Sequence, residues 1–236
     1  MKILIPPSEG KANIKKPMDT KFGNTDFKYM DEVKKVIRLL SLIRNTEIRS
    51  IYGTSQEKAE LFHRQNQDAM NSRVCHAIDR YTGVVYDHID WQTLSEDAQD
   101  YMDKYVGIFS GLFGLVTPRT LIPNYKLKMN VQALQYFWRP ILTNILKEEE
   151  LVIDLLPQVH RKSYDKKEVN VIEVEFLIFN TNTEKTSTAG HYGKAVKGEF
   201  IRFMALNNVK SIDDFKGFAY EGFKWNGKSF IKEVNE

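Results

Sequence analysis

The spacing of apolar residues predicts helices in several parts of the chain. Residues 29–44 are predicted as an amphipathic helix, because their apolar residues recur at intervals of three and four. These residues are Val33, Val36, Ile37 and Leu40. Further helices are predicted at residues 55–70, 93–106, 133–150 and 190–207. Ser55 and Ser95 stand at N-cap positions, and Pro140 marks a kink or a start.

Short apolar runs predict strands between these helices. The run at residues 2–5 stops at two prolines, which is typical of a buried strand with a sharp end. Strands are also predicted at residues 151–156 and 170–179, and residues 107–129 are predicted as a buried strand followed by an irregular loop. Residues 76–90 are predicted as a short strand with a turn at Gly83.

Helices and strands alternate without an obvious break between domains. The pair Asn226-Gly227 near the end of the chain predicts a hairpin. No internal repeat, low-complexity tract or linker divides the 236 residues, which are enough to bury a substantial core. The sequence therefore predicts a single domain over residues 1–236 with a mixed α/β (α+β) fold, in which helices flank a mixed sheet.

Composition and charge limit the cellular compartment and the kinds of partner that we expect for this protein. The formal net charge is +3, which permits an acidic partner but does not require one. Cys75 is the only cysteine, so an intramolecular disulfide is excluded and a reducing compartment is expected. The first residues contain too short an apolar run for a signal peptide. No stretch approaches the roughly 20 apolar residues of a membrane span. We expect a cytoplasmic protein without a membrane partner.

The helix predicted at residues 190–207 separates basic from large apolar side chains. At about 100° per residue the two groups lie on opposite sides. The basic group is His191, Lys194, Lys197 and Arg202, and the apolar group is Val196, Phe200, Phe203 and Met204. Gly190 and Gly193 would let a phosphate approach free N–H groups at the helix start. Two interpretations stay open. The basic side chains are either a solvated face on a helix that packs against the core, or a surface that binds successive phosphate groups.

The segment after this helix contains an apolar-and-glycine pattern. Ile212, Phe215, Gly217 and Phe218 fit a helix-hairpin-helix, in which N–H groups of the turn hold a DNA phosphate. The alternative is a plain connection between a helix and a strand. Phe223 favours a strand soon afterwards, which makes a second helix doubtful.

Two loops carry further candidates for anion binding. Residues 8–11 follow the first strand and end in Lys11, so they are either an anion site or a structural turn. They do not form a Walker motif. In residues 110–129, Arg119 and Lys126 supply charge, and Tyr125 could stack on a base or cap a pocket. The alternative for this stretch is a buried strand and loop with incidental charges.

Signals for a metal, a cofactor or a catalytic site are weak. The five histidines show no metal-ligand spacing, and no second cysteine is present to complete a zinc site. A thiolate role for Cys75 beside His76 is less favoured than a buried, inert cysteine, because neighbouring residues of a strand point in opposite directions. No nucleophile elbow or nucleotide fingerprint is present. The sequence thus predicts no cofactor and no metal, and it leaves open whether the protein is an enzyme.

Several motifs occur together in an order that resembles the YaaA peroxide-stress family, also called the UPF0246 family. They are ILIPPS at the start, YTGVVY at 81–86, SGLFGLVTPRTLIPNYKLKM at 110–129, YFW at 136–138, LVIDL at 151–155, GKAVKGEFIRF and FKGFAYEGF. The resemblance runs nearly from end to end, and the block at 110–129 is its most specific part. One departure follows LVIDL, where the family commonly has Ser-x-Glu-Tyr and this chain has Pro157, Val159 and His160.

The resemblance implies a family-specific fold with a positively charged cleft and a helix-hairpin-helix-like element. It also implies DNA binding, survival of hydrogen peroxide and limitation of free intracellular iron. The residues that match the family's basic helix are Lys194, Lys197, Gly198 and Arg202. Those that match the hairpin-like segment are Ile212, Phe215 and Gly217, and those that match the loop block are Arg119, Tyr125 and Lys126.

The leading hypothesis is therefore a protein of the peroxide response that binds double-stranded or structured DNA through phosphate contacts, with Lys11 as a further candidate contact. The alternative is an enzyme that holds a nucleotide or another phosphate-bearing small molecule in the same basic cleft. An iron-handling protein is a third hypothesis, and the lack of clustered ligands argues against it.

Overall fold

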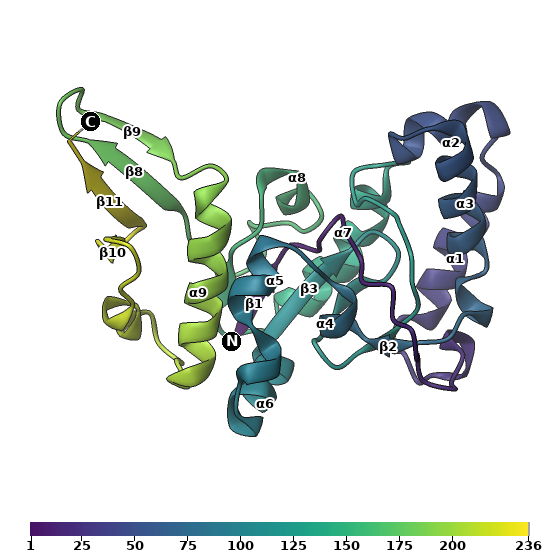
Figure 1. Ribbon diagram of the computed structural model, residues 1–236, viewed down its shortest axis with the longest axis horizontal. Helices are drawn as coiled ribbons and strands as arrows, with labels where there is room; N and C mark the ends of the chain where they lie inside the picture. The colour runs from purple at the N-terminus through teal and green to yellow at the C-terminus, as the bar shows by residue number, and fades with distance from the viewer. Residues whose placement is uncertain (236) are drawn as a thin grey trace.

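The computed structural model describes residues 1–235. A central sheet stands between a helical arm and a smaller C-terminal sheet, and both extend to the same side of the molecule (Figure 1). The helices are α1 (Met30–Ser41), α2 (Asn45–Tyr52), α3 (Gln56–Gln67), α4 (Ala77–Arg80), α5 (Val84–Ile89), α6 (Glu96–Tyr105), α7 (Leu134–Leu146), α8 (Gln158–Arg161) and α9 (Tyr192–Leu206). Short 3-10 helices are η1 (Phe22–Asn24), η2 (Ala69–Asn71), η3 (Trp91–Thr93) and η4 (Ile212–Gly217).

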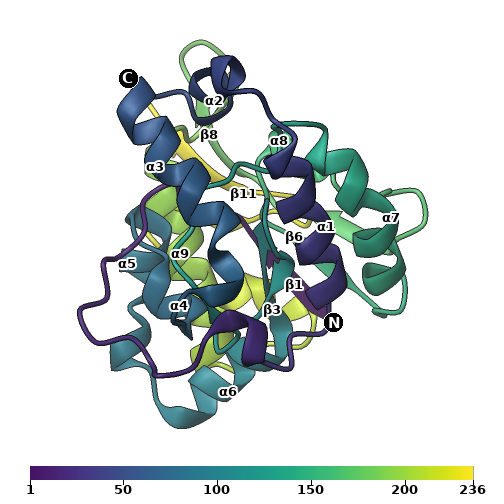
Figure 2. The same ribbon diagram turned by 90° about the vertical axis from the view of Figure 1, so that its right-hand side faces the viewer.

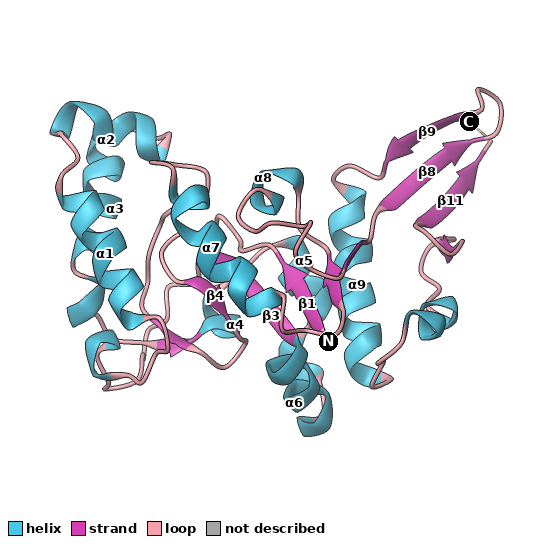
Figure 3. Cartoon of the chain, turned by 180° about the vertical axis from the view of Figure 1, so that it is seen from behind, coloured by secondary structure: helices cyan, strands magenta, loops and turns pink. Residues whose placement is uncertain are grey.

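The central sheet has the strand order β4-β3-β1-β6-β7. Its strands are β1 (Lys2–Ile5), β3 (Val106–Ser110), β4 (Gly114–Val116), β6 (Val152–Asp154) and β7 (Val171–Glu173). Neighbouring strands run parallel except at β4, which is antiparallel to β3. Helix α7 lies against this sheet in the view from behind (Figure 3). The predicted mixed α/β class with a mixed sheet is confirmed, and the single-domain boundaries stay a prediction.

Continuous apolar strands explain the position of β1. Ile3, Leu4 and Ile5 are fully buried, as expected for a strand with parallel neighbours on both sides and other elements on both faces. Pro6 and Pro7 then end the strand, because proline cannot donate to the hydrogen-bond ladder. The run at residues 2–5 is a strand, as its pattern predicted.

Helices α1, α2 and α3 form the helical arm, which faces the viewer in Figure 2. Val33, Val36 and Leu40 of α1 are buried on one face, in agreement with the predicted amphipathic helix. Helix α2 was not predicted from the pattern. A further short pair, β2 (Cys75–His76) and β5 (Leu121–Ile122), runs antiparallel beneath this arm.

The prediction of a strand and turn at residues 76–90 is mostly wrong. Strand β2 contributes only His76 to this range, Tyr81 forms an isolated bridge with Lys11, and most of the rest forms α4 and α5. Gly83 does mark a turn, because it adopts a φ of 100° immediately before α5 begins. Val85 and Ile89 are β-branched, yet they lie in a helix because this places both against the core. Tertiary burial overrides their strand propensity here.

The predicted strand at residues 170–179 is two strands that belong to different sheets. Strand β7 ends the central sheet, and β8 (Phe176–Asn180) enters the C-terminal sheet, whose order is β10-β11-β8-β9. The other members are β9 (Lys185–Thr188), β10 (Lys224–Trp225) and β11 (Phe230–Val234). The break lies at Val174 and Glu175, whose backbone groups pair with Asp154 and Phe230 respectively.

The C-terminal sheet contains the hairpin that Asn226-Gly227 predicted. Trp225 pairs with Phe230 across the turn, and Gly227 adopts a φ of 95°. Aromatic rings fill the space between this sheet and α9. Phe200 of α9 contacts Phe215 and Phe230 at ring-centroid distances of 4.9 and 4.8 Å. Such edge-to-face pairs stabilise the layer beyond the apolar area that they bury.

Helix α9 lies between α5 and the C-terminal sheet (Figure 1). This explains why Ile201 and Ala205 are buried together with Val196, Phe200 and Met204 of the predicted apolar group. Gly198 is the point of closest approach, since a Cβ atom there would stand 2.5 Å from the Val85 carbonyl oxygen. The helix is therefore packed on two sides.

The other predicted helices also form. The Ser95 hydroxyl caps α6 by accepting a hydrogen bond from Ala98 N at 3.3 Å, whereas Ser55 occupies the N-cap position of α3 without such a bond. Pro140 lies inside α7. Among residues 1–235, no helix combines the length and apolar content that a bilayer crossing requires.

Candidate functional site: a cleft at the switch point of the sheet

A cleft opens where the chain leaves β1 and β6. These strands are parallel neighbours, but the chain continues from β1 towards β3 on one side and from β6 towards β7 on the other. Loops that leave adjacent strands in opposite directions create a crevice at the carboxyl ends, which is where α/β sheets usually bind ligands. The cavity there has a volume of about 850 Å³.

The walls of this cleft come from five segments of the chain. They are the loop after β1 (residues 6–10), the start of α5 (82–86), α8 with its preceding loop (156–161), the link between β7 and β8 (174–176), and the start of α9 with its preceding loop (188–197). Proline, valine, leucine and phenylalanine residues line the cleft together with a few charged residues, which include cations and the carboxylates Glu9 and Glu175. Ligand pockets commonly combine a mostly apolar wall with a small number of placed polar groups.

A buried ionic network supports one wall of the cleft. Asp154, at the end of β6, is fully buried and accepts hydrogen bonds from Tyr164 Oη at 2.5 Å and Leu156 N at 2.6 Å. Arg161 of α8 lies 3.2 Å from Asp154 and 2.8 Å from Glu173. Burial raises the pKa of Asp154 above its usual range, while Tyr164 and Arg161 act in the opposite direction. The network holds α8 against the strand end.

Two nitrogen-bearing side chains of the cleft lie close to this network. Lys197 of α9 donates a hydrogen bond to the Leu155 carbonyl oxygen, and burial lowers its pKa to about 8. His160 of α8 has its Nδ1 atom buried without a hydrogen-bond partner. Burial, followed by the nearby charge of Lys197, lowers the pKa of His160 to about 4. The imidazole is therefore neutral at physiological pH.

Lys194 gives the cleft an exposed cation. It lies one turn before Lys197 on α9, and both line the cleft. In residues 1–235, no carboxylate lies within 4 Å of the amine of Lys194 or Lys197. The structure thus brings these two predicted site residues together.

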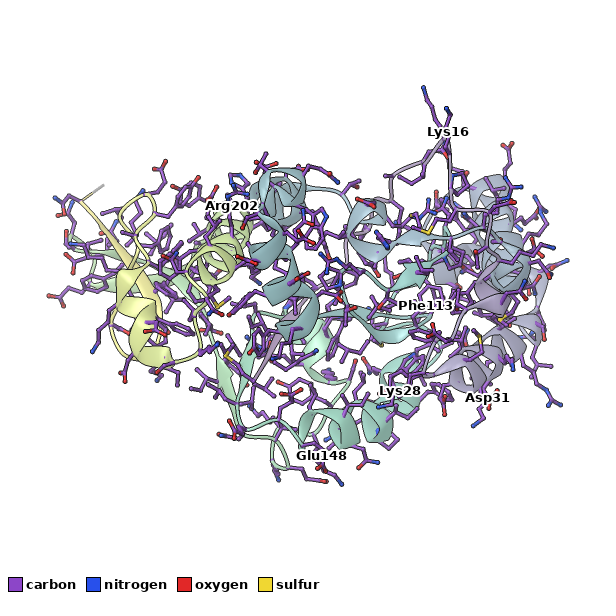
Figure 4. All side chains as sticks on the ribbon, turned by 90° about the horizontal axis from the view of Figure 1, so that it is seen from below. Lys16, Lys28, Asp31, Phe113, Glu148 and Arg202 are labelled. Carbon is purple, nitrogen blue, oxygen red and sulfur yellow. The ribbon has the colours of Figure 1, made fainter. Side chains whose placement is uncertain are left out.

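Gly198 and Arg202, the other predicted residues of this helix, serve its packing. Gly198 is buried against α5. Arg202 donates hydrogen bonds to the carbonyl oxygens of Ile89 and Asp90 at 2.8 and 3.0 Å, at the C-terminal end of α5. A cation there satisfies free carbonyls and complements the helix dipole. Figure 4 labels Arg202 beside α9.

Lys11 and Tyr125 lie under the loop that follows β1. The Lys11 amine donates to the Ser8 carbonyl oxygen at 2.7 Å and stands 4.5 Å from the centre of the Tyr125 ring. Burial lowers the pKa of Lys11 to about 7. Tyr125 is buried and hydrogen-bonds to Tyr81 and Ser110, so its ring is not available to stack on a base. These residues support the cleft loop from below.

The cations of the 110–129 block are paired with carboxylates: Arg119 with Asp100, and Lys126 with Glu9 at the edge of the cleft. Arg119 bonds to Asp100, and its backbone N–H donates to Asp103 at 2.8 Å. Lys126 donates to the Glu9 carbonyl oxygen at 2.7 Å and lies 3.9 Å from the Glu9 carboxylate. Because these charges are offset locally, they do not form an open basic surface with Lys194.

Gly217 lies at the end of η4, whose N-cap is Ser211. The segment after it forms a bridge between Tyr220 and Phe223 and then β10. A strand follows the turn in place of a second helix, because Phe223 is buried in the aromatic layer. The segment therefore lacks the second helix of a helix-hairpin-helix, and DNA binding by it stays a prediction.

Several polar residues of the site were not chosen from the sequence, among them His160 and Arg161, which line the cleft, and Asp154, which supports its wall. The family comparison drew attention to residues 157–160 only as a departure. The sequence does contain one indication of a site there, because these residues lie at or directly after the end of the predicted strand at 151–156. The carboxyl end of a parallel strand carries functional side chains in α/β folds.

Comparison with known proteins decides the family. The family model described as "Peroxide stress protein YaaA" matches residues 1–229. The chain belongs to the YaaA peroxide stress family. It is similar to a UPF0246 protein of Flavobacterium johnsoniae, with 28% identity over 245 residues that cover 96% of this chain and 95% of the relative. A UPF0246 protein of Fusobacterium nucleatum is 25% identical and covers 100% and 97% of the two chains. The resemblance inferred from the YaaA motifs is thus confirmed.

The neutral state of His160 can be tested by NMR. We expect its ring signals to keep their neutral positions as the pH falls to about 5 and to titrate with a midpoint of about 4. The unfolded chain binds this proton near the ordinary histidine pKa of about 6.5, so stability falls between pH 6.5 and 4. His160→Gln should remove that part of the pH dependence. A midpoint above 6 would contradict the burial of this ring.

Proposed function

We propose that this peroxide stress protein binds a phosphate-bearing small molecule, such as a nucleotide, in the switch-point cleft. The observation that carries the proposal is the convergence of Lys194 and Lys197 on a cavity of about 850 Å³. A pocket of this size encloses a small molecule, and charge-assisted hydrogen bonds from lysine suit a phosphate. The apolar wall supports a ligand with an uncharged body beside its anionic group.

The positions of the other cations favour a small-molecule pocket as the binding site and not an open groove for a duplex. Arg119 and Lys126 are paired with carboxylates, and Arg202 binds the end of α5. A duplex would need several free cations at successive phosphates, each adding about 0.9 to the slope of log affinity against log salt concentration. Only part of the predicted set is placed for that purpose.

DNA binding is the second candidate function. It is favoured by the exposure of His191 and Lys194 at the start of α9 and of Lys210 and Lys216 around η4, next along the chain. These side chains would reach backbone phosphates without reading base sequence. The effect on intracellular iron stays a prediction of the family resemblance.

Ligand binding should be compared for ATP, inorganic phosphate and a 20-base-pair duplex at about 100 mM salt by calorimetry. We expect Lys194→Ala to weaken binding of the phosphate-bearing small molecule about tenfold, which corresponds to about 1.4 kcal/mol. Lys16→Ala is the matched control, because Lys16 projects from the surface away from the cleft (Figure 4) and loses the same charge.

Two results would reject the small-molecule proposal. One is binding of the duplex without binding of ATP or phosphate, which would make DNA the ligand. The other is equal loss of affinity in Lys194→Ala and Lys16→Ala, which would mean that net charge and not the cleft attracts the anion.

A further inference from the structure

The surroundings of Lys197 differ from those of an ordinary lysine. Its amine lies in the cleft wall, its direct hydrogen-bond acceptor is the neutral Leu155 carbonyl, and the nearby charges include the cations Arg161 and Lys194. The carboxylate of Asp154 attracts it from a greater distance. Burial dominates this balance and lowers the pKa to about 8, so that a larger fraction of the amine is uncharged near neutral pH than in an ordinary lysine.

An uncharged amine in this position can act as a nucleophile. One N–H bond is held by the Leu155 carbonyl, which restrains the side chain. The nitrogen lone pair remains available to an electrophile in the cleft. Lysines that are desolvated and lie near another cation are activated in this way.

His160 supplies a group for proton transfer in the same cleft. Its imidazole lines the cleft and is neutral, and the charge of Lys197 contributes to lowering its pKa. Its Nδ1 atom is buried and without a partner in residues 1–235. A buried polar atom without a partner requires an explanation, and a proton-transfer role is one that the cleft provides.

We propose that Lys197 forms an imine with a small aldehyde or ketone that carries a phosphate, and that His160 transfers the protons. The proposal rests on the phosphate-binding function of the cleft, in which Lys194 holds the anionic group one turn away on the same helix. The carbonyl carbon of the substrate then lies within reach of Lys197.

The step balances without an external oxidant or reductant. The Lys197 lone pair attacks the carbonyl carbon, a C–N bond forms, and the carbonyl π electrons move to oxygen. His160 carries one N–H proton to this oxygen, which becomes a hydroxyl group. It then carries the second N–H proton to the hydroxyl group, the C–O bond breaks, water leaves, and the nitrogen lone pair forms the C=N bond. The products are the imine and one water molecule, and the imidazole is again neutral.

Pyridoxal 5′-phosphate is a suitable probe, because it is an aldehyde with a phosphate group. The full chain is incubated with it at pH 7.4, reduced with borohydride and digested, and the modified peptides are identified by mass spectrometry. We expect modification mainly at Lys197, at least tenfold faster than at Lys16. Lys197→Arg should abolish it while preserving the positive charge, and an unchanged unfolding midpoint verifies the fold.

Two further variants separate the roles. Lys194→Ala should raise the probe concentration needed for half-maximal labelling about tenfold, with Lys197 still the labelled residue. His160→Gln should slow labelling at saturating probe at least tenfold, while the affinity for 4′-deoxypyridoxine 5′-phosphate, which has no aldehyde, is unchanged. An equal labelling rate in His160→Gln would exclude the proton-transfer role.

The outcome also distinguishes this inference from the proposed function. If the deoxy analogue binds in the cleft but labelling falls on Lys194 or spreads over surface lysines, the imine proposal is wrong and the phosphate site stands. If neither the analogue nor ATP nor inorganic phosphate binds, the proposed function itself is wrong. Labelling of Lys197 that is equally fast with pyridoxal, which has no phosphate, would contradict the phosphate-bearing substrate class.

Discussion

Asp154→Ala should lower the free energy of unfolding by about 3–5 kcal/mol, as expected when one member of a buried ion pair is removed. The carboxylate is fully buried and bonds to Arg161, Tyr164 and the Leu156 backbone. Its removal leaves these donors without an acceptor at the end of β6. Urea denaturation at pH 7 measures the effect.

Asp31→Ala provides the contrast for this measurement. Asp31 forms an exposed ion pair with Lys34 at 3.0 Å, and such pairs contribute about 0–1 kcal/mol. Asp154→Asn keeps the volume and part of the hydrogen bonding, so its effect should lie between the two alanine variants. A loss below about 1 kcal/mol in Asp154→Ala would show that the network does not stabilise the wall of the cleft.

Gly198→Ala should destabilise the protein by about 1–3 kcal/mol, although alanine is the better helix former. The added Cβ atom would stand 2.5 Å from both the His88 Cβ atom and the Val85 carbonyl oxygen. Backbone and Cβ atoms cannot move aside cheaply, so α9 must shift away from α5. Since α9 carries Lys194 and Lys197, the same variant should also weaken ligand binding in the cleft.

Gly193→Ala is the matched control on the same helix. Its Cβ atom would stand 3.3 Å from the Ala189 Cβ atom and 4.0 Å from the Phe176 Cβ atom, and it would approach no backbone of another helix. We expect its free energy of unfolding to stay within about 1 kcal/mol of the parent. Equal stability of the two glycine variants, measured by urea denaturation, would refute the close packing of α9 on α5.

Predictions from local patterns succeeded where burial follows one periodic face. Helix α1, strand β1 and the hairpin at Asn226-Gly227 lie where the sequence placed them. They failed where an element packs on two sides or changes layer. Residues 84–89 contain β-branched residues but form α5, because burial in the core outweighs their strand propensity. The apolar run at 170–179 is divided between two sheets.

The candidate site was predictable only in part. The sequence placed Lys194 and Lys197 together, since helical spacing alone brings residues three apart onto one face. It could not show that Arg202 binds α5 or that Lys126 is paired with Glu9, because both partners are more than 100 residues away in the chain.

The sequence by itself therefore determined the family, the mixed α/β class and the main periodic elements, because these depend on motifs and on the spacing of neighbouring residues. Only the tertiary structure decided which cations remain free and that His160 and Lys197 line one cleft. Charge pairing and desolvation depend on contacts between distant segments, and the carboxyl ends of β1 and β6 become one site only after the sheet has formed.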